Sequence, residues 1–272
     1  MLYRSLWTGA AVLALSITAL SAQEKKLNCN DGNNYSRDDR FRFCEVREVT
    51  TSALPKFRIE PGMNGGVSVK GWTRGEVLIR AKVEAAARSQ GDADALGRQV
   101  QIRTTGGEIT ASGPEMRDRE NWSVSFEVFV PTRTDLDVKA HNGGINLSDL
   151  RGDITFRTAN GGVNLTRLAG NVTGETTNGG LNVDLDGSRW EGGELDVKTV
   201  NGGVNLNVPQ NFAARLETGT VNGRVKIELP HSSPDRGMEG NAGGSYRGDI
   251  NGGGPLVRVQ TTNGGVNVRR KS

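Results

Sequence analysis

A short motif recurs along the second half of the chain: Asn-Gly-Gly, followed by an apolar, a polar and a second apolar residue. Five close copies and one degenerate copy, the latter at Asn222, begin at Asn142, Asn160, Asn178, Asn201, Asn222 and Asn263. The first four copies follow one another closely and at nearly even steps, and the last step is about twice as long as the others. A period of roughly 20 residues is typical of a repeat array, in which each unit is stabilised by its neighbours.

The residues between two motifs alternate between apolar and polar, as they do in β-strands. In the unit 152–169, Ile154, Phe156 and Thr158 precede the turn and Val163 and Leu165 follow it, each separated by a polar residue. Period two puts one set of side chains inward and the other in solvent. About five inward residues, at roughly 1.5–3 kcal/mol each, cannot offset the ordering entropy of one unit. Each unit is therefore predicted to be two strands that need stacked neighbours.

The Asn-Gly-Gly turns leave two arrangements open. Asn-Gly is a strong hairpin signal, because tight turns often need positive φ, and a second glycine permits close backbone approach. The units could therefore be antiparallel hairpins in a meander. They could instead be coils of a β-solenoid, with equivalent side chains stacked about 4.8 Å apart. The near-constant period favours the solenoid, so we predict an all-β, parallel β-helix-like fold over residues 132–272.

The rest of the chain divides into smaller regions. Residues 46–131 are predicted to form an irregular β region that caps the solenoid, with strands at 76–84, 99–104 and 122–130. Residues 85–96 fit a loop or a short helix, and 113–121 fit a polar hairpin loop. The long step between Asn222 and Asn263 contains a Gly-, Ser- and Pro-rich segment, 231–254, which is predicted to be a loop.

The N-terminus has the pattern of an export signal. Arg4 precedes an uncharged apolar run from Leu6 to Leu20, so residues 1–22 are predicted to be a signal peptide cut after Ser21 or Ala22. A short membrane anchor is the alternative, although the run is shorter than the roughly 20 residues of a spanning helix. The polar leader 23–45 follows.

The two cysteines of the chain, Cys29 and Cys44, lie at either end of this leader's polar part. In an oxidising, exported compartment such a pair usually forms a disulfide. The chain-entropy estimate for a loop of this length is about 3 kcal/mol. We therefore predict a bridge that fastens the leader to the fold.

The asparagine two residues after each glycine pair occupies the same outward position in every unit. Stacked coils would align these amides as a flat ladder. The ladder could simply satisfy its own hydrogen bonds, or it could present a regular polar face to a sugar or a partner protein. The residues of this possible binding face are Asn146, Asn164, Asn182, Asn205 and Asn267.

Little in the sequence points to catalysis. His141 precedes a turn and His231 lies in the predicted loop, neither with metal-ligand spacing, and phosphate-loop and nucleophile-elbow motifs are absent. We therefore predict no catalytic, cofactor-binding or metal-binding residues. Carboxylates do gather in the longer unit that begins at Asn178, and β-helix enzymes that cleave polysaccharides use paired carboxylates. The gathered residues, which also fit a solvated surface, are Asp184, Asp186, Glu191, Glu194 and Asp196.

Charge does not indicate a nucleic-acid partner. The formal net charge is only +3, and acidic and basic residues are interspersed. A basic group, Arg269-Arg270-Lys271, stands at the C-terminus and fits either a solvated tail or contact with an anionic envelope polymer.

The serial order of these features resembles a known bacterial family. Asn64-Gly65-Gly66-Val67, a strand ending in Val130-Pro131, Leu136-Asp137-Val138 and the repeated Asn-Gly-Gly-Val-Asn-Leu units follow one another between Val46 and Arg270. This order is similar to the bacterial "putative adhesin" β-strand-repeat family, a domain of unknown function. The resemblance implies a β-helix-like fold, an envelope or surface location and no catalytic residues.

Together these features predict a non-enzymatic secreted scaffold of the cell envelope, an adhesin-like binding protein in the periplasm or outside the cell. Its expected partner is an envelope protein or a glycan, without a cofactor. A carbohydrate-active β-helix enzyme is the alternative.

Overall fold

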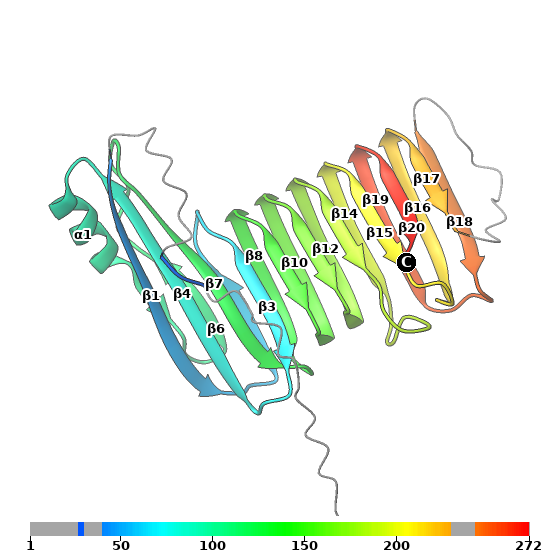
Figure 1. The fold of residues 1–272 in the computed structure, drawn as a ribbon, viewed down its shortest axis with the longest axis horizontal. Coiled ribbons are helices and arrows are strands. Elements are labelled where there is room, and N and C mark those ends of the chain that lie inside the picture. The colour runs from blue at the N-terminus through cyan, green and yellow to red at the C-terminus, as the bar shows by residue number, and fades with distance from the viewer. Residues whose placement is uncertain (1–26, 30–39, 230–242, 272) are drawn as a thin grey trace, which may run out of the picture.

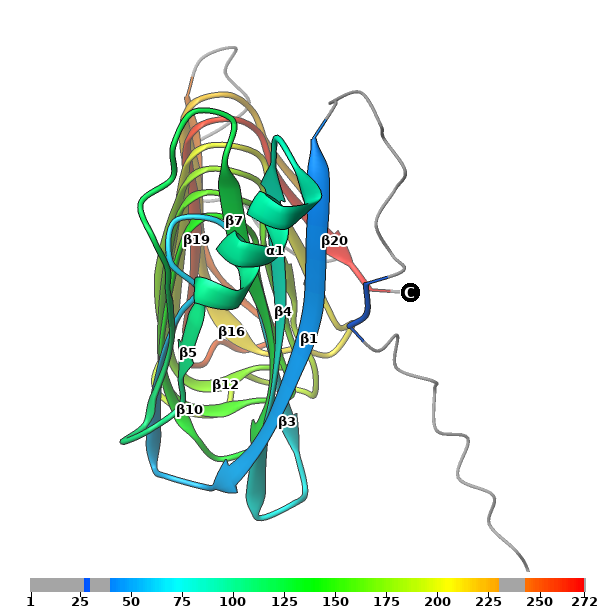
Figure 2. The ribbon, with the colours of Figure 1, turned by 90° about the vertical axis from the view of Figure 1, so that its left-hand side faces the viewer.

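The computed structural model describes residues 27–29, 40–229 and 243–271. Within them the chain forms two β-sheets of ten strands each. The strands follow one another along the long axis of the molecule (Figure 1), and a view along that axis shows the two sheets as facing walls of a flattened tube (Figure 2). The prediction of an all-β, solenoid-like fold with long parallel sheets is confirmed.

Each repeat unit contributes one strand to each of the two sheets. In spatial order sheet A consists of β1 (Phe41–Ser52), β4 (Glu76–Ala87), β7 (Asn121–Pro131), β3 (Val67–Trp72), β9 (Ile145–Ser148), β11 (Val163–Thr166), β13 (Leu181–Asp184), β15 (Val204–Val208), β20 (Val266–Arg270) and β17 (Val225–Glu228). Sheet B consists of β18 (Gly244–Ile250), β16 (Ala214–Asn222), β19 (Leu256–Asn263), β14 (Leu195–Asn201), β12 (Ala169–Asn178), β10 (Arg151–Asn160), β8 (Asp135–Asn142), β2 (Lys56–Glu60), β6 (Glu108–Ser112) and β5 (Gln101–Arg103).

Consecutive repeat units pair in parallel and in register. β10 lies between β8 and β12, with Asn160 opposite Asn142 on one side and Asn178 on the other. After the turn the chain crosses to sheet A, where β11 lies between β9 and β13. Because the two strands of one unit belong to different sheets, the alternative of antiparallel hairpins is wrong for these units.

The core lies between the sheets and is built from stacked apolar side chains. The inward residue that follows the turn is fully buried in each of five units, which contribute Ile145, Val163, Leu181, Val204 and Val266. Leu165, one inward position further along β11, is 1% exposed. At Gly174 an added Cβ would meet the ring of Phe156 on β10 at 2.4 Å, so one large side chain fills the space of two positions. The inward positions of successive units therefore stack on one another, as the repeat predicts.

The last unit of the sequence is not the last unit in space. β19 lies between β14 and β16 in sheet B, and β20 lies between β15 and β17 in sheet A. In sequence order the outer unit β16/β17 therefore precedes the unit β19/β20. In space the unit β19/β20 lies between β16/β17 and β14/β15. The spatial order of the turn asparagines is 142, 160, 178, 201, 263 and 222, which differs from their order in the sequence.

The prediction of a loop at 231–254 is wrong for the second half of that segment. Residues 244–250 form β18, which pairs antiparallel with β16 and buries Tyr246 and Ile250. Glycine and serine weaken a strand signal in the sequence, but the exposed edge of β16 supplies a partner that local patterns do not show. His231 and the first half of the segment lie outside the described residues.

The N-terminal region extends both sheets at the opposite end. β2 and β3 pair in parallel with β8 and β9, and Asn64 bridges Asn142, so the early Asn-Gly-Gly copy is a unit of the same stack. β7, β4 and β1 continue sheet A, with antiparallel β4–β7 and β1–β4 pairs. Residues 113–120 connect β6 in sheet B to β7 in sheet A, so the expected hairpin at 113–121 is wrong.

One helix, α1 (Gln90–Gln99), follows β4 where a loop or a short helix was expected. The hydroxyl of Ser89 caps it by accepting a hydrogen bond from the backbone N–H of Asp92. The predicted disulfide is confirmed, since Cys29 is bonded to Cys44 on β1. In the described ranges, no helix combines the length and the apolar character needed to cross a membrane. The predicted signal peptide lies outside those ranges.

Candidate functional site

The outward asparagines of the repeat form a continuous row on sheet A. We call it the amide face and define it as Asn146, Asn164, Asn182, Asn205 and Asn267. Each side-chain amide after Asn146 donates a hydrogen bond from Nδ2 to the Oδ1 of the residue before it in this row, at distances of 2.6, 2.9, 2.8 and 3.3 Å in that order. The structure therefore brings together all five residues that the sequence singled out.

A second row of amides runs along the turns. This turn ladder starts at Asn222 and passes through Asn263 and Asn201, and each amide donates to the next at 2.7–2.9 Å as far as Asn142. Asn142 donates to Asn64, whose amide donates to Asn121 at the start of β7. The row consists of Asn222, Asn263, Asn201, Asn178, Asn160, Asn142 and Asn64.

The reason for the turn glycines differs from the one expected. The turn asparagines are not among the positive-φ residues of the described chain. The first glycine of each motif is instead required by stacking. A Cβ on Gly161 would lie 2.1 Å from the carbonyl oxygen of Gly143 in the neighbouring unit, and Gly179 has the same contact with Gly161. The second glycine is under less constraint: a Cβ on Gly162 would lie 3.5 Å from its nearest atom.

A buried threonine completes each turn. The hydroxyl of Thr176 donates to the carbonyl oxygen of Gly161, the first glycine of the neighbouring unit, at 2.9 Å. Four other threonines make the equivalent contact with a neighbouring unit, namely Thr158, Thr199, Thr261 and Thr220. This threonine supplies a hydrogen bond inside the tube to a carbonyl that the turn directs inward. The pattern of a threonine two residues before the asparagine was visible in the sequence but did not by itself show this role.

The amide face retains hydrogen-bonding capacity toward solvent. A primary amide has two N–H donors and two acceptor lone pairs. Each internal member of the ladder uses one N–H and one lone pair on its neighbours, so one donor and one acceptor per unit remain. Asn146, Asn164 and Asn182 are exposed, and the units are spaced at about 4.8 Å. Such a surface can bind a repeating hydroxyl- or amide-bearing partner, and it has no group that could act as a nucleophile or a general acid.

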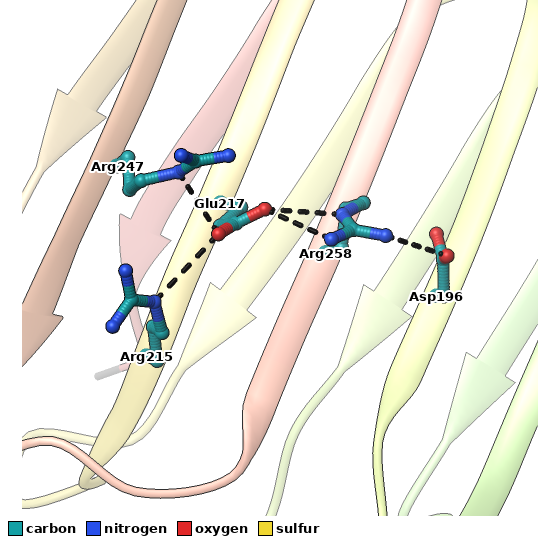
Figure 3. A network of polar contacts seen from close by, with 5 residues as sticks. All are labelled: Asp196, Arg215, Glu217, Arg247 and Arg258. Carbon is teal, nitrogen blue, oxygen red and sulfur yellow. Dashed lines mark hydrogen bonds and ion pairs between the residues drawn. The ribbon is translucent and has the colours of Figure 1, made fainter.

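The outer face of sheet B carries charges that pair across strands. Arg258 on the inserted strand β19 contacts Asp196 on β14 at 2.9 Å and Glu217 on β16 at 3.0 Å, and Arg247 on β18 contacts Glu217 at 2.9 Å (Figure 3). Burial raises the pKa of Glu217, but the hydrogen bond from Arg258 and the nearby positive charges outweigh it and leave that pKa below its usual range. The network holds β19 between its two neighbours.

A shallow groove of about 540 Å³ lies beside this network, over the strands from β2 to β14 in sheet B. Its lining includes Thr155, Thr173 and the charged residues Arg157, Glu175 and Lys198. Glu175 pairs with Arg157 at 2.9 Å and with Lys198 at 3.2 Å. The largely polar lining differs from the mostly apolar walls of a small-molecule pocket.

The five carboxylates considered for catalysis are divided between the two sheets and the connection between them, although Asp186 and Glu191 line one groove. Asp184 accepts a hydrogen bond from Asn207 on sheet A, whereas Asp196 pairs with Arg258 on sheet B. Glu191 pairs with Arg151. Among the described residues, no three His, Cys, Asp or Glu side chains gather closely enough to hold a metal ion. His141 is exposed at the end of β8.

The stacked units, the two facing parallel sheets and the amide ladders define the class as a solenoid-like β-repeat protein. The chain belongs to the Toastrack DUF4097 family, whose model matches residues 63–269. The match covers the stack from its first Asn-Gly-Gly unit to its last strand in the sequence.

Solved structures that match the chain share little sequence with it. A "putative cell adhesion protein" from Clostridium sporogenes ATCC 15579 is 11% identical with a TM-score of 0.36, over 84% of this chain and 100% of that one. A "putative adhesin" from Bacteroides fragilis NCTC 9343 is 11% identical with a TM-score of 0.41, over 84% and 97%. A "putative lipid binding protein" from Parabacteroides distasonis ATCC 8503 is 10% identical with a TM-score of 0.31, over 83% and 96%. No curated protein matches the chain.

Proposed function

We propose that this protein is a non-enzymatic, exported scaffold of the cell envelope that binds an extended partner, a glycan or an envelope protein, along the amide face. The observation that carries the proposal is the ladder of five outward amides, in which each unit keeps a free donor and a free acceptor at a constant spacing. Many weak, equivalent hydrogen bonds along one line suit a polymer better than a compact ligand.

The disulfide supports the location. Bridges of this kind persist in oxidising compartments, which agrees with the predicted signal peptide at 1–22 and with a periplasmic or extracellular protein. We also propose that the region 46–131 acts as the end cap of the stack. Its antiparallel strands and α1 stand beyond the first Asn-Gly-Gly unit, where an open solenoid would expose its core.

The test compares two triple variants that remove the same chemistry from different surfaces. Asn164→Ala, Asn182→Ala and Asn205→Ala together delete the centre of the amide face. The matched control, Asn160→Ala, Asn178→Ala and Asn201→Ala, deletes three neighbouring rungs of the turn ladder. Binding is measured to purified envelope polysaccharides and to immobilised envelope protein fractions, and thermal unfolding is recorded for both variants.

We expect the first variant to lose binding by at least tenfold while its unfolding temperature changes no more than that of the control. The control should bind like the unchanged protein. Equal losses of binding in the two variants, or unchanged binding with a loss of stability alone, would show that the amide face is only a structural ladder.

A further inference from the structure

The strand β1 ends sheet A with a long edge. It pairs with β4 over all twelve of its residues, from Phe41 opposite Ala87 to Ser52 opposite Glu76, and no other described strand pairs with it. Within the described part of the chain, the backbone groups on its outer side therefore have no strand partner, and β1 contains no proline. Long edges of this kind are templates for pairing with another chain.

Apolar side chains are exposed along this edge. Phe41 is 50% exposed and Val49 is 41% exposed, although both lie at positions whose β4 partners, Ala87 and Ile79, are buried. Their exposure arises because no described strand follows β1. A further strand added at this edge would cover them.

The sequence of β1 is complementary to itself in one register. We propose that two copies of this protein associate through their β1 strands, antiparallel, about a two-fold axis that passes through Val46. Residues whose numbers add up to 92 then stand opposite each other. Glu45 faces Arg47 of the second copy twice, and Phe43 faces Val49 of the second copy twice. Opposite charges and apolar side chains in cross-strand pairs are stabilising.

Neighbouring symmetric registers bring like charges together. An axis through Glu45 would place that carboxylate opposite itself, and axes through Arg47 or Glu48 would do the same to those residues. Charges on an edge strand normally prevent unwanted pairing, since like charges in opposed positions repel. On β1 the same charges disfavour the registers centred on Glu45, Arg47 and Glu48, and they favour the register centred on Val46. A two-fold interface of this kind is self-complementary and closes as a dimer.

Besides β4, two described segments contact β1, namely α1 and the segment that carries Cys29. α1 packs on one side of the strand, where the guanidinium of Arg47 donates to the carbonyl oxygens of Val100 and Gly97. The segment that carries Cys29 lies on the opposite side of the strand from α1 (Figure 2). Both therefore lie beside the faces of β1, and α1 also extends beyond β1 at this end of the long axis (Figure 1). The dimer would join two stacks end to end and leave both amide faces uncovered.

The experiment measures the mass of the full chain, purified from the exported fraction with its disulfide formed, by light scattering over a range of concentrations. We expect a monomer–dimer equilibrium, together with concentration-dependent protection of alternate β1 amides in hydrogen exchange. Glu45→Arg turns two attractive pairs into two repulsive ones and should weaken dimerisation by roughly tenfold or more. The control Glu194→Arg makes the same charge change far from β1 and should leave the mass unchanged.

A second variant keeps the test independent of any folding defect in the first. Glu45→Arg combined with Arg47→Glu restores opposite charges in the same register and should recover the dimer at least in part. A monomer at every concentration, without protection of β1 at its outer edge, would overturn the proposal. A dimer that is equally stable with Glu45→Arg would also overturn it, because the contact would then lie elsewhere.

Discussion

The two glycines of the turn motif at Asn160 should respond differently to substitution by alanine. In Gly161→Ala, the new Cβ would lie 2.1 Å from the carbonyl oxygen of Gly143, whereas an ordinary contact begins at 3.4 Å. The stacked turns would have to separate locally until this contact lengthens from the first distance to the second. The same carbonyl oxygen accepts the hydroxyl hydrogen bond of Thr158 at 2.9 Å, so this bond would be strained as well.

Steric overpacking costs about 1–3 kcal/mol, and a lost hydrogen bond adds about 1 kcal/mol. We therefore expect Gly161→Ala to lower the free energy of unfolding by about 2–4 kcal/mol, which for a domain of this size lowers the unfolding temperature by on the order of 10 °C. In Gly162→Ala the nearest atom is 3.5 Å away and φ is not positive, so the change should be within about 0.5 kcal/mol or slightly stabilising.

The assay is urea unfolding of the two variants and the unchanged protein, followed by circular dichroism and tryptophan fluorescence. The midpoints should differ between the variants while the slopes agree, because the surface exposed on unfolding is the same. If Gly161→Ala unfolds at the midpoint of the unchanged protein, or if Gly162→Ala is equally destabilised, then close stacking does not explain the first glycine.

Three further results are expected. Thr176→Val keeps the shape of the side chain but leaves the carbonyl oxygen of Gly161 without the hydroxyl that donates to it, so the free energy of unfolding should fall by about 1–3 kcal/mol. Both this variant and its control, Thr177→Val at an exposed position, are measured by denaturant titration. The pKa of Glu217 is lower in the folded protein than in the unfolded chain, so its contribution to the free energy of unfolding is present above the unfolded pKa and is lost as the pH falls through the folded pKa. Glu217→Gln should therefore flatten the acid limb of the curve of stability against pH, and an unaltered limb would contradict this role. Leu165→Asp places a charge in the core, where Leu165 is 1% exposed, and should abolish cooperative unfolding or soluble expression; a nearly unchanged melting curve would show that the inward assignment is wrong.

The sequence by itself determined the local geometry of the repeat. Period-two alternation identified which side chains of β10 and β11 face the core, because neighbouring residues of a strand must point to opposite faces. The near-constant spacing of the motif indicated stacked coils, and the cysteine pair indicated the disulfide. The five residues of the amide face followed from the same repeat, since equivalent positions of stacked units must align.

The tertiary structure alone decided which unit lies beside which. All units present nearly the same turn backbone and the same apolar faces, so a sequence comparison cannot rank possible neighbours. The insertion of β19 and β20 depends on cross-strand contacts such as Arg258 with Asp196 and Glu217, which join residues 62 and 41 positions apart. β18 forms for the same reason, because the edge of β16 supplies its hydrogen bonds. The sequence shows that each turn contains glycine. The reason for the glycine is that the backbones of two neighbouring turns lie very close together, which happens only when the units are stacked.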